Sequence, residues 1–458
     1  MNLNNYKHIY FIGIGGIGMS AIARYFNSKN LSVSGYDKVK SDLCVELETE
    51  GISIHYNENV ENIPNLVKEN KNECLIVYTP AISNSHFQYQ YFRKNKYKVL
   101  KRAEVLGLIS QKYFTIAVAG THGKTTTSTM LAHILTHGKM DCTAFLGGIS
   151  KNYKSNFLIS EKENIIVVEA DEYDKSFLQL NPDIAIITSV DADHLDVYGN
   201  KENLHNTFSD FADNIKKNGT LILENSIDST LFSQKEISIV KYSAVENSDY
   251  HAKNISVSNG KMVFDVHSPK GNIVGAELCM AGNHNISNAI ACISVSQLMG
   301  LSNDTIVEGI QSFQGIKRRF DVQISTPYLV FIDDYAHHPK EITESLKAVK
   351  ILHPNKQMTV VFQPHLYSRT QDFADDFAES LSVANQLVIL DIYGAREKEI
   401  PGVTSEMLLS KCTNSEKEVS SKNDIVEVLK KKNIELLVTL GAGDISTKVQ
   451  SIKNMLEG

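Results

Sequence analysis

The sequence lacks the patterns that mark several classes of protein. Its six cysteines, at positions 44, 74, 142, 279, 292 and 412, form no C-x-x-C pair, which argues against a disulfide framework and a structural zinc site. No apolar run reaches about 18 residues, and the first glycine-rich turn comes too early for a signal peptide. The net charge is −7 without any basic block, so nucleic acid is not expected as the main partner. We expect a cytoplasmic protein with no membrane insertion.

Arginine is also scarce. Of the 46 basic residues, 39 are lysine and only 7 are arginine. The arginines are Arg24, Arg93, Arg102, Arg318, Arg319, Arg369 and Arg396. A planar guanidinium grips phosphate or carboxylate with two parallel bonds, whereas lysine acts as a point charge. The few arginines are therefore candidate anion contacts.

What is present is the composition and pattern of a soluble α/β protein. The chain is 42% hydrophobic and 22% charged, and its 458 residues suggest about three domains of roughly 150 residues each. Short apolar runs alternate with amphipathic stretches, which is typical of parallel α/β units. Strands are expected at residues 8–12, 31–35, 74–78, 114–119, 165–168, 184–188, 329–332, 358–362, 387–390 and 436–440. Between residues 237 and 279 the pattern alternates around Ser258-Asn259-Gly260, which predicts a hairpin.

The first glycine-rich turn separates a buried strand from a helix. It holds Gly13, Gly15, Gly16 and Gly18, and Asp37 ends the following strand. Glycines let the backbone approach a pyrophosphate, which the helix N-terminus then holds through free amides and its dipole. NAD is the first hypothesis for the ligand. Any nucleotide diphosphate satisfies the same geometry, and a tight turn with no ligand is the plain alternative.

A second glycine turn lies in a strand, loop and helix around residue 120. Gly120, Gly123, Lys124 and Thr125 match an ATP-binding loop, in which amides cradle phosphates, the lysine reaches the β and γ oxygens, and the threonine ligates magnesium. Only two residues separate the glycines, which departs from G-x-x-x-x-G-K-T. The strand, turn and helix context still predicts a phosphate loop.

Acidic residues follow two further strands. Glu169, Asp171 and Glu172 come after the first, and Asp193, His194 and Asp196 come after the second. Taken alone, each acid is better explained as a helix cap or a solvated loop residue. Carboxylates at the carboxyl edge of a parallel sheet, beside a phosphate loop, are nevertheless where magnesium finds oxygen ligands. Their shared placement favours Glu169 and His194 as metal ligands.

These motifs, with those that follow them, resemble the Mur ligases, which are ATP-dependent, amide-forming enzymes of peptidoglycan synthesis. The matching segments are GTHGKTTT, EADEYD, DADHLD, GNHNISNAIA (282–291), FQGIKRRFD (313–321), DDYAHHP (333–339), FQPHLYSRT (362–370) and GAGDI (441–445). The pattern is closest to the members that join L-alanine to UDP-N-acetylmuramate. The resemblance runs from Gly13 to Ile445.

The resemblance implies an α/β fold of three domains. A Rossmann-like domain at 1–106 would bind the UDP-sugar, and a central ATPase-like domain at 107–320 would carry a mainly parallel sheet with a small antiparallel portion. A second Rossmann-like domain at 321–458 would close on ATP and the amino acid. The first glycine turn would then hold the UDP diphosphate and not NAD.

The resemblance also assigns residues to ligands. UDP-sugar contacts are expected from Gly13, Gly15, Gly16, Gly18, Met19, Ser20, Asp37 and Arg102. ATP contacts are expected from Gly120, Thr121, His122, Gly123, Lys124, Thr125, Thr126, Asn283, His284, Asn285, Arg319 and Asp334. Thr125, Glu169 and His194 would hold Mg²⁺, for which Mn²⁺ would substitute. Lys124, Glu169, His194, Arg319, His337, His365 and Arg369 would be catalytic, and Tyr335 would lie beside His337.

In the implied reaction, the lactyl carboxylate attacks the γ-phosphate of ATP and the amine of L-alanine then attacks the acyl phosphate. Both steps concentrate negative charge, so catalysis is expected to rest on positioning and charge neutralisation. The alternatives are a murein-peptide ligase that uses a recycled tripeptide, an NAD-dependent dehydrogenase and a nucleotide-sensing module without activity. A monomer or a homodimer is expected.

The sequence departs from the family pattern at three positions. Leu366 stands where arginine is common, Gly394 where proline is common and Tyr173 where serine is frequent. No lysine matches the carbamylated lysine that some Mur ligases use near the metal. His338, before Pro339, is as well explained by a helix start as by a functional role.

Overall fold

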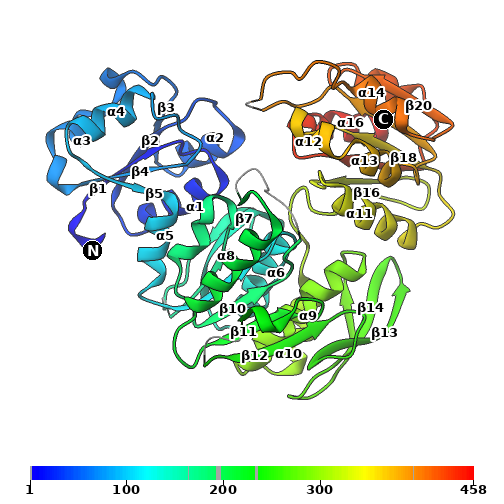
Figure 1. The fold of residues 1–458 in the computed structure, drawn as a ribbon, viewed down its shortest axis with the longest axis horizontal. Helices are drawn as coiled ribbons and strands as arrows, with labels where there is room; N and C mark the ends of the chain where they lie inside the picture. The colour runs from blue at the N-terminus through cyan, green and yellow to red at the C-terminus, as the bar shows by residue number, and fades with distance from the viewer. Residues whose placement is uncertain (1–2, 163, 192–197, 233–235, 396) are drawn as a thin grey trace. The chain divides into compact units, whose positions relative to one another are not determined.

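The computed structural model describes residues 3–162, 164–191, 198–232, 236–395 and 397–458. They form three β-sheets with helices packed against them (Figure 1). The chain divides into two compact units, one of residues 1–254, 264–276 and 287–314, the other of residues 255–263, 277–286 and 315–458. Among the described residues, no helix has both the length and the apolar character needed to cross a bilayer.

The first sheet has five parallel strands in the order β3-β2-β1-β4-β5. The strands are β1 (His8–Ile12), β2 (Ser32–Tyr36), β3 (Ser53–His55), β4 (Cys74–Tyr78) and β5 (Lys98–Lys101), and the helices are α1 (Ile17–Ser28), α2 (Asp42–Thr49), α3 (Asn65–Glu69), α4 (Phe87–Lys94) and α5 (Arg102–Ser110). Alternate side chains of a strand point to opposite faces. Phe11 accordingly joins the core shared with α1, while Tyr10 packs against Phe92 of α4 on the other face.

The central sheet has ten strands in the order β15-β14-β13-β12-β11-β10-β6-β9-β7-β8. Its elements are β6 (Phe114–Ala119), α6 (Lys124–His137), β7 (Cys142–Ser150), β8 (Ser155–Leu158), β9 (Ile165–Glu169), β10 (Ile184–Ile187), α8 (Lys201–Asp213), β11 (Thr220–Glu224), β12 (Ser238–Ser243), β13 (Tyr250–Ser258), β14 (Lys261–His267), β15 (Ile273–Leu278), α9 (Asn283–Leu298) and α10 (Asn303–Ser312). Strand β6 runs parallel to both of its neighbours, β9 and β10. The loops after these three strands therefore meet at one edge of the sheet.

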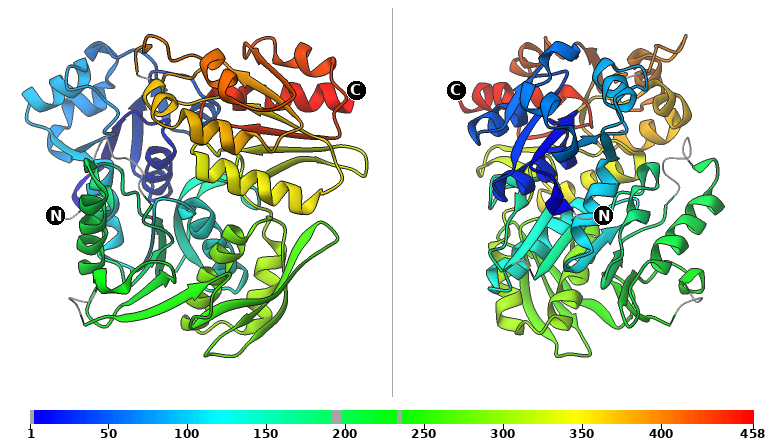
Figure 2. Two further views of the ribbon diagram at one scale, coloured as in Figure 1. Left: turned by 45° about the vertical axis from the view of Figure 1, so that its right-hand side comes forward. Right: turned by 90° about the vertical axis from the view of Figure 1, so that its left-hand side faces the viewer.

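The third sheet has six strands in the order β16-β17-β21-β18-β19-β20, of which only β16 is antiparallel to its neighbour. Its elements are β16 (Asp321–Ser325), β17 (Val330–Asp334), α11 (Pro339–Leu352), β18 (Met358–Phe362), α12 (Tyr367–Asp372), α13 (Ala374–Leu381), β19 (Gln386–Leu390), α14 (Ser405–Lys411), β20 (Glu416–Ser420), α15 (Ile425–Lys430), β21 (Leu436–Leu440) and α16 (Val449–Glu457). Helices cover both faces (Figure 2). Val361 packs with α15 and α16, and its neighbour Phe362 contacts Phe377 of α13.

The structure confirms the predicted α/β fold class and most of the predicted strands. Five strands have the predicted bounds to the residue, namely β1, β4, β6, β18 and β21. The hairpin is also confirmed, since Asn259 and Gly260, which join β13 to β14, both have positive φ, as a type I′ turn requires. The strands that the sequence pattern missed include the short edge strands β3, β5 and β20. The domain boundaries stay a prediction.

Candidate functional site

The phosphate loop joins β6 to α6 and is shaped by two glycines. Gly120 and Gly123 have φ of 135° and 80°, which other residues rarely adopt. A Cβ at Gly123 would also lie 2.6 Å from Oδ1 of Asn288, a residue of α9. The loop is therefore restricted to glycine at residue 123 by both its backbone and a neighbouring side chain, and Asn288 was missed by the sequence analysis.

The loop is held by residues that follow β10 at the same sheet edge. The Ser189 hydroxyl accepts a bond from the His122 amide at 2.8 Å and lies 2.9 Å from the Thr121 hydroxyl. The Thr188 hydroxyl donates to the carbonyls of Ala119 and His122. These contacts fix the first half of the loop, whereas Thr125 and Thr126 are buried in the first turn of α6. The signal for Thr188 and Ser189 was their position directly after a parallel strand.

Lys124 forms a buried ion pair at the start of α6. Its ammonium lies 2.8 Å from the Glu172 carboxylate, which is fully buried, and donates to the Gly120 carbonyl at 2.6 Å. Burial opposes the charged form, but the negative charges of Glu172, Asp171 and Glu169 outweigh it and raise the pKa of Lys124. Lys124 therefore stays cationic, as contact with phosphate requires.

Thr125 and Glu169 come together beside the loop. The Thr125 hydroxyl donates to Glu169 Oε1 at 3.1 Å, and Oε2 of Glu169 accepts a bond from the Gly147 amide at 3.0 Å. A hydroxyl and a carboxylate are the oxygen donors that magnesium prefers, and this ion commonly completes its shell with water and substrate phosphates. Within the described residues, no cluster of three or more acidic, histidine or cysteine ligands occurs. The predicted ligand His194 lies outside them, as do Asp193 and Asp196.

The first glycine turn is fixed from behind by Asp37. One carboxylate oxygen accepts a bond from the Gly15 amide at 2.8 Å, and the other accepts one from Val39 at 3.1 Å. Gly13 has φ of 86°, and a Cβ there would lie 2.6 Å from the Thr79 side chain. Asp37 thus shapes the turn itself, and the contact to uridine predicted for it stays a prediction. Ser20 is fully buried, and its hydroxyl donates to the Ile17 carbonyl.

A cavity of about 250 Å³ lies between the first glycine turn and the acidic end of β9. One wall is the start of α1, with Gly16, Gly18 and Met19 among its residues, and the other is β7 with the acidic strand end. The full lining is Gly16, Ile17, Gly18, Met19, Ala21, Thr79, Arg102, Leu106, Phe145, Leu146, Gly147, Glu169 and Asp171. The cavity thus extends from the first glycine turn to the Glu169 carboxylate.

Arg102 lies at this cavity. It donates to Asp171 at 3.2 Å, and a Cβ at Gly18 would lie 2.6 Å from its guanidinium. A glycine at position 18 is therefore needed for the guanidinium to approach the turn. The structure places one of the scarce arginines in the lining of this cavity.

The second compact unit holds a separate group of predicted residues around Tyr335, which follows β17. The guanidinium groups of Arg318 and Arg319 lie 4.8 and 4.6 Å from its ring centre. Arg318 also donates to the carbonyls of Gly441 and Gly443 at 2.7 and 3.1 Å, so it holds the GAGDI turn. Arg319 is the arginine of this pair whose guanidinium makes no such backbone bond among the described contacts.

His337, His365 and Tyr393 form a chain of rings beside this group. The ring centres of His337 and His365 are 6.0 Å apart, and His365 stacks on Tyr393 at 5.7 Å. Burial lowers the pKa of His337 to about 4; Glu341 opposes this shift, and the charges of Arg369 and Arg319 add to it. Burial and the Arg369 charge likewise lower the pKa of His365 to about 4. Both imidazoles are therefore neutral near pH 7.

Two further predicted residues, Asp334 and Asn285, have structural partners. Asp334 is buried and accepts bonds from Ser345 at 2.7 Å and the Ala336 amide at 3.1 Å, and burial raises its pKa. Asn285 donates to the Ala281 carbonyl at 2.7 Å and lies 3.0 Å from Nε2 of His284, while Asn283 begins α9. Their contacts with a nucleotide stay a prediction.

The three residues that depart from the family pattern lie in different structural environments. Leu366 has φ of 70°, which is strained for a leucine, and it precedes α12. A Cβ at Gly394 would lie 2.7 Å from the Tyr367 ring. Tyr173 is 44% exposed and its amide donates to Asp171. Arg396 lies outside the described residues.

Comparison with known proteins gives three family matches along the chain. Residues 8–114 match the Mur ligase family catalytic domain, residues 118–296 the Mur ligase middle domain and residues 318–444 the Mur ligase glutamate ligase domain. The UDP-N-acetylmuramate–L-alanine ligase of Phocaeicola vulgatus is 46% identical over 457 residues, which cover 100% of this chain and 99% of that protein. The chain belongs to the Mur ligase family.

Solved structures agree with this assignment of the Mur ligase fold. The UDP-N-acetylmuramate–alanine ligase of Thermotoga maritima superposes with a TM-score of 0.82 at 26% identity, over 98% of this chain and 99% of that one. A murein peptide ligase of Psychrobacter arcticus gives 0.71 at 23% identity, over 98% of each chain, and shows the fold alone. This Mur ligase therefore spans nearly the whole length of each of these three proteins.

Proposed function

We propose that this chain joins L-alanine to the lactyl carboxylate of UDP-N-acetylmuramate, with ATP converted to ADP and phosphate, in the cytoplasmic synthesis of peptidoglycan precursors. The observation that carries the proposal is the 46% identity, over the whole length, to the Phocaeicola vulgatus ligase of that name. The cavity and the phosphate loop described above have a geometry that suits the nucleotide sugar and ATP.

The cavity suits the nucleotide sugar. The start of α1 has no side-chain cap, so its amides and dipole are suited to a diphosphate at the turn of Gly15, Gly16 and Gly18. Arg102 would add a guanidinium contact to the same anion. The sugar would then extend along the cavity and bring the lactyl carboxylate towards Glu169.

The first chemical step is attack of this carboxylate on the γ-phosphorus of ATP, which forms an acyl phosphate and releases ADP. The phosphate loop would hold the ATP phosphates with its amides, and Lys124 would move from Glu172 to the transferring phosphoryl group. Thr125 and Glu169 would hold Mg²⁺, with His194 as the expected third ligand. That ion would supply charge neutralisation between the phosphates and the substrate carboxylate.

The second step is attack of the L-alanine amine on the acyl phosphate, with expulsion of phosphate. Arg319, which stacks on Tyr335, would neutralise the γ-phosphoryl group before and after transfer. His365 and Arg369 would contact the substrate carboxylate or the intermediate. His337 would contribute as a neutral imidazole, since its pKa is about 4.

A turnover assay with UDP-N-acetylmuramate, ATP and L-alanine tests the proposal. Phosphate release should require all three compounds, and mass spectrometry should show the alanyl product. The tripeptide used by murein-peptide ligases serves as the competing acceptor, because that enzyme shares the fold. Phosphate release that depends on the tripeptide and not on L-alanine would show that the chain is a murein-peptide ligase. No phosphate release with either acceptor would reject ligase activity.

A further inference from the structure

Asn156 of β8 makes three contacts with one face of α1. Its amide nitrogen donates to the Ile17 carbonyl and, at 2.9 Å, to the Ser20 hydroxyl, and its amide oxygen accepts a bond from the Arg24 guanidinium. Positions 17, 20 and 24 follow the i, i+3, i+7 spacing of a helix face. The amide has one orientation only, because a guanidinium can only donate and a carbonyl can only accept.

The polar side chains of this contact are buried. Asn156 has 0% exposure, as has Ser20, and Arg24 has 7%. A buried guanidinium needs partners for its N–H groups. Arg24 also donates to Glu50 at 2.7 Å and to Glu46 at 3.1 Å, which lie at the C-terminal end of α2. The bonds therefore form one chain from α2 through α1 to β8, and they account for an arginine that no sequence motif explained.

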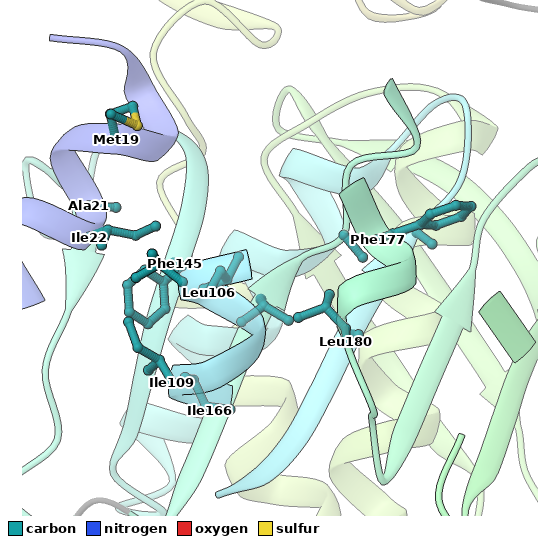
Figure 3. Packing of buried hydrophobic residues seen from close by; sticks show 14 of the residues in the cluster. Met19, Ala21, Ile22, Leu106, Ile109, Phe145, Ile166, Phe177 and Leu180 are labelled. Carbon is teal, nitrogen blue, oxygen red and sulfur yellow. The ribbon is translucent and has the colours of Figure 1, made fainter. Parts of the chain in front are cut away.

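An apolar contact between the same elements surrounds the polar chain. The ring of Tyr25 on α1 lies 5.7 Å from that of Phe145 on β7 and 6.4 Å from that of Phe157 on β8. Met19, Ala21 and Ile22 of α1 belong to the same hydrophobic cluster as Phe145 of β7 and Leu106 of α5, and Figure 3 shows Ile22 next to Phe145. Within such close packing, a uniquely oriented hydrogen bond sets the rotation and the height of the helix.

The position of α1 also sets the geometry of the substrate cavity. Gly16, Gly18 and Met19 line it from the helix, and Phe145 and Gly147 line it from β7. Phe145 is paired with Phe157, the residue that follows Asn156. Asn156 therefore joins the start of α1 to the strand pair that forms the opposite wall.

We infer that Asn156 is a positioning residue for the nucleotide sugar: it holds the diphosphate turn at the start of α1 in register with β7 and the Glu169 carboxylate, without touching the substrate. The inference rests on the proposed function, because it assigns this cavity to UDP-N-acetylmuramate. No catalytic group is displaced by its loss, so the effect should fall on binding of the nucleotide sugar.

The test compares Asn156→Asp and Asn156→Ala with Asn27→Ala in the full-length enzyme. The aspartate keeps the shape and the acceptor for Arg24 but loses the donor to Ile17. Asn27 is the matched control, because it is on α1 and donates to Glu50 of the α2 end at 3.1 Å but does not reach β8. Calorimetry measures Kd for UDP-N-acetylmuramate and for ADP, and steady-state kinetics separate KM from kcat.

Both Asn156 variants should raise Kd and KM for UDP-N-acetylmuramate about tenfold, the effect of losing one or two buried hydrogen bonds. Kd for ADP and kcat should stay within about twofold, and Asn27→Ala should change none of these values. Unchanged affinity for the sugar in Asn156→Asp would overturn the inference, and so would an equal loss of ADP affinity in both variants. If the unsubstituted enzyme failed to bind UDP-N-acetylmuramate, that result would reject the proposed function itself, independently of any effect of Asn156.

Discussion

At the scale of single residues, two cations of the candidate site in the first unit are paired with acids. Lys124 is bonded to Glu172 and Arg102 to Asp171. Removing one partner of a buried pair leaves an uncompensated charge, which is why single substitutions in such pairs are strongly destabilising. The same pairing means that ATP must replace Glu172 as the partner of Lys124 during catalysis.

Replacement of Lys124 with alanine should abolish ATP turnover while leaving UDP-N-acetylmuramate binding intact. Loss of a single transition-state donor costs about 100- to 1,000-fold in kcat. Phosphate release and calorimetric titration with the sugar nucleotide measure the two effects. Lys112→Ala is the control, because Lys112 is exposed and bonded only to Asn4 among the described contacts. Retained turnover in Lys124→Ala would reject the role of Lys124.

The neutral state of His337 predicts a loss of stability in acid. Its pKa is about 4 in the folded chain, below the usual value near 6.5, so the unfolded chain binds more protons between these pH values. Stability contributed by the neutral ring is therefore complete above about pH 6.5 and lost as pH falls towards 4, by roughly 3 kcal/mol at most.

His337→Asn should remove part of this slope. Thermal unfolding between about pH 7 and pH 4.5 measures it, because in this window the ring becomes protonated in the unfolded chain while it stays mostly neutral in the folded one. His267→Asn, at an exposed histidine, provides the control. If His337→Asn kept the same acid dependence as the unsubstituted enzyme, the assignment of the slope to His337 would be contradicted.

At the scale of elements, the site depends on the strand, loop and helix unit of β6 and α6. Gly123 has φ of 80° and faces Asn288, so a side chain there meets both backbone strain and a steric conflict. Gly51, with φ of 89°, has nothing within 4 Å of an added Cβ. Alanine variants at the two positions therefore separate the effect of backbone strain, which both share, from the effect of the steric conflict with Asn288, which only Gly123 has.

Gly123→Ala should raise KM for ATP at least about tenfold, because the loop must move away from Asn288, whereas Gly51→Ala should leave KM unchanged. Both should lose about 1 kcal/mol of stability from the left-handed backbone. Steady-state kinetics with ATP and thermal unfolding measure these effects. Equal KM values in the two variants would show that the contact with Asn288 is unimportant.

At the scale of the whole molecule, the first two sheets share one hydrophobic core. A single cluster contains Phe11 of β1, Ile22 of α1, Phe145 of β7 and Phe208 of α8. The core of the third sheet is a separate cluster that includes Phe331, Val361 and Leu437. Elements in one core are expected to unfold together.

Phe145→Ala should therefore loosen α1 and β7 together. Truncation of a buried phenylalanine costs about 3 to 5 kcal/mol. Amide hydrogen exchange, read by mass spectrometry, should speed up in peptides from both sheets of the first unit. Phe331→Ala is the comparison and should affect peptides of the third sheet. Faster exchange in β7 with no change in α1 would show that the first two sheets are energetically independent.

The sequence predicted the central strands and the chemistry of the loops, but not the contacts between distant segments. Apolar runs such as 74–78 and 436–440 are buried on both faces, so each strand is a continuous apolar run and its ends are visible where the apolar residues stop. Edge strands such as Ser53–His55 are short and half exposed, and they carry no such signal. Lys124 and Glu169 belong to local motifs. The contacts described for Asn156, Asn288 and Ser189 are with partners 67 or more residues away, for which a single sequence shows no pattern.

The cavity wall is also a suitable position for a fluorescent probe of binding. The chain contains no tryptophan, and Ile17, at the cavity, is 37% exposed. An indole introduced by Ile17→Trp would be the sole fluorophore of its kind in the chain, so its emission would report on this one cavity against a dark background. Titration with the nucleotide sugar could then be followed in real time, by stopped flow, separately from every later step of the reaction.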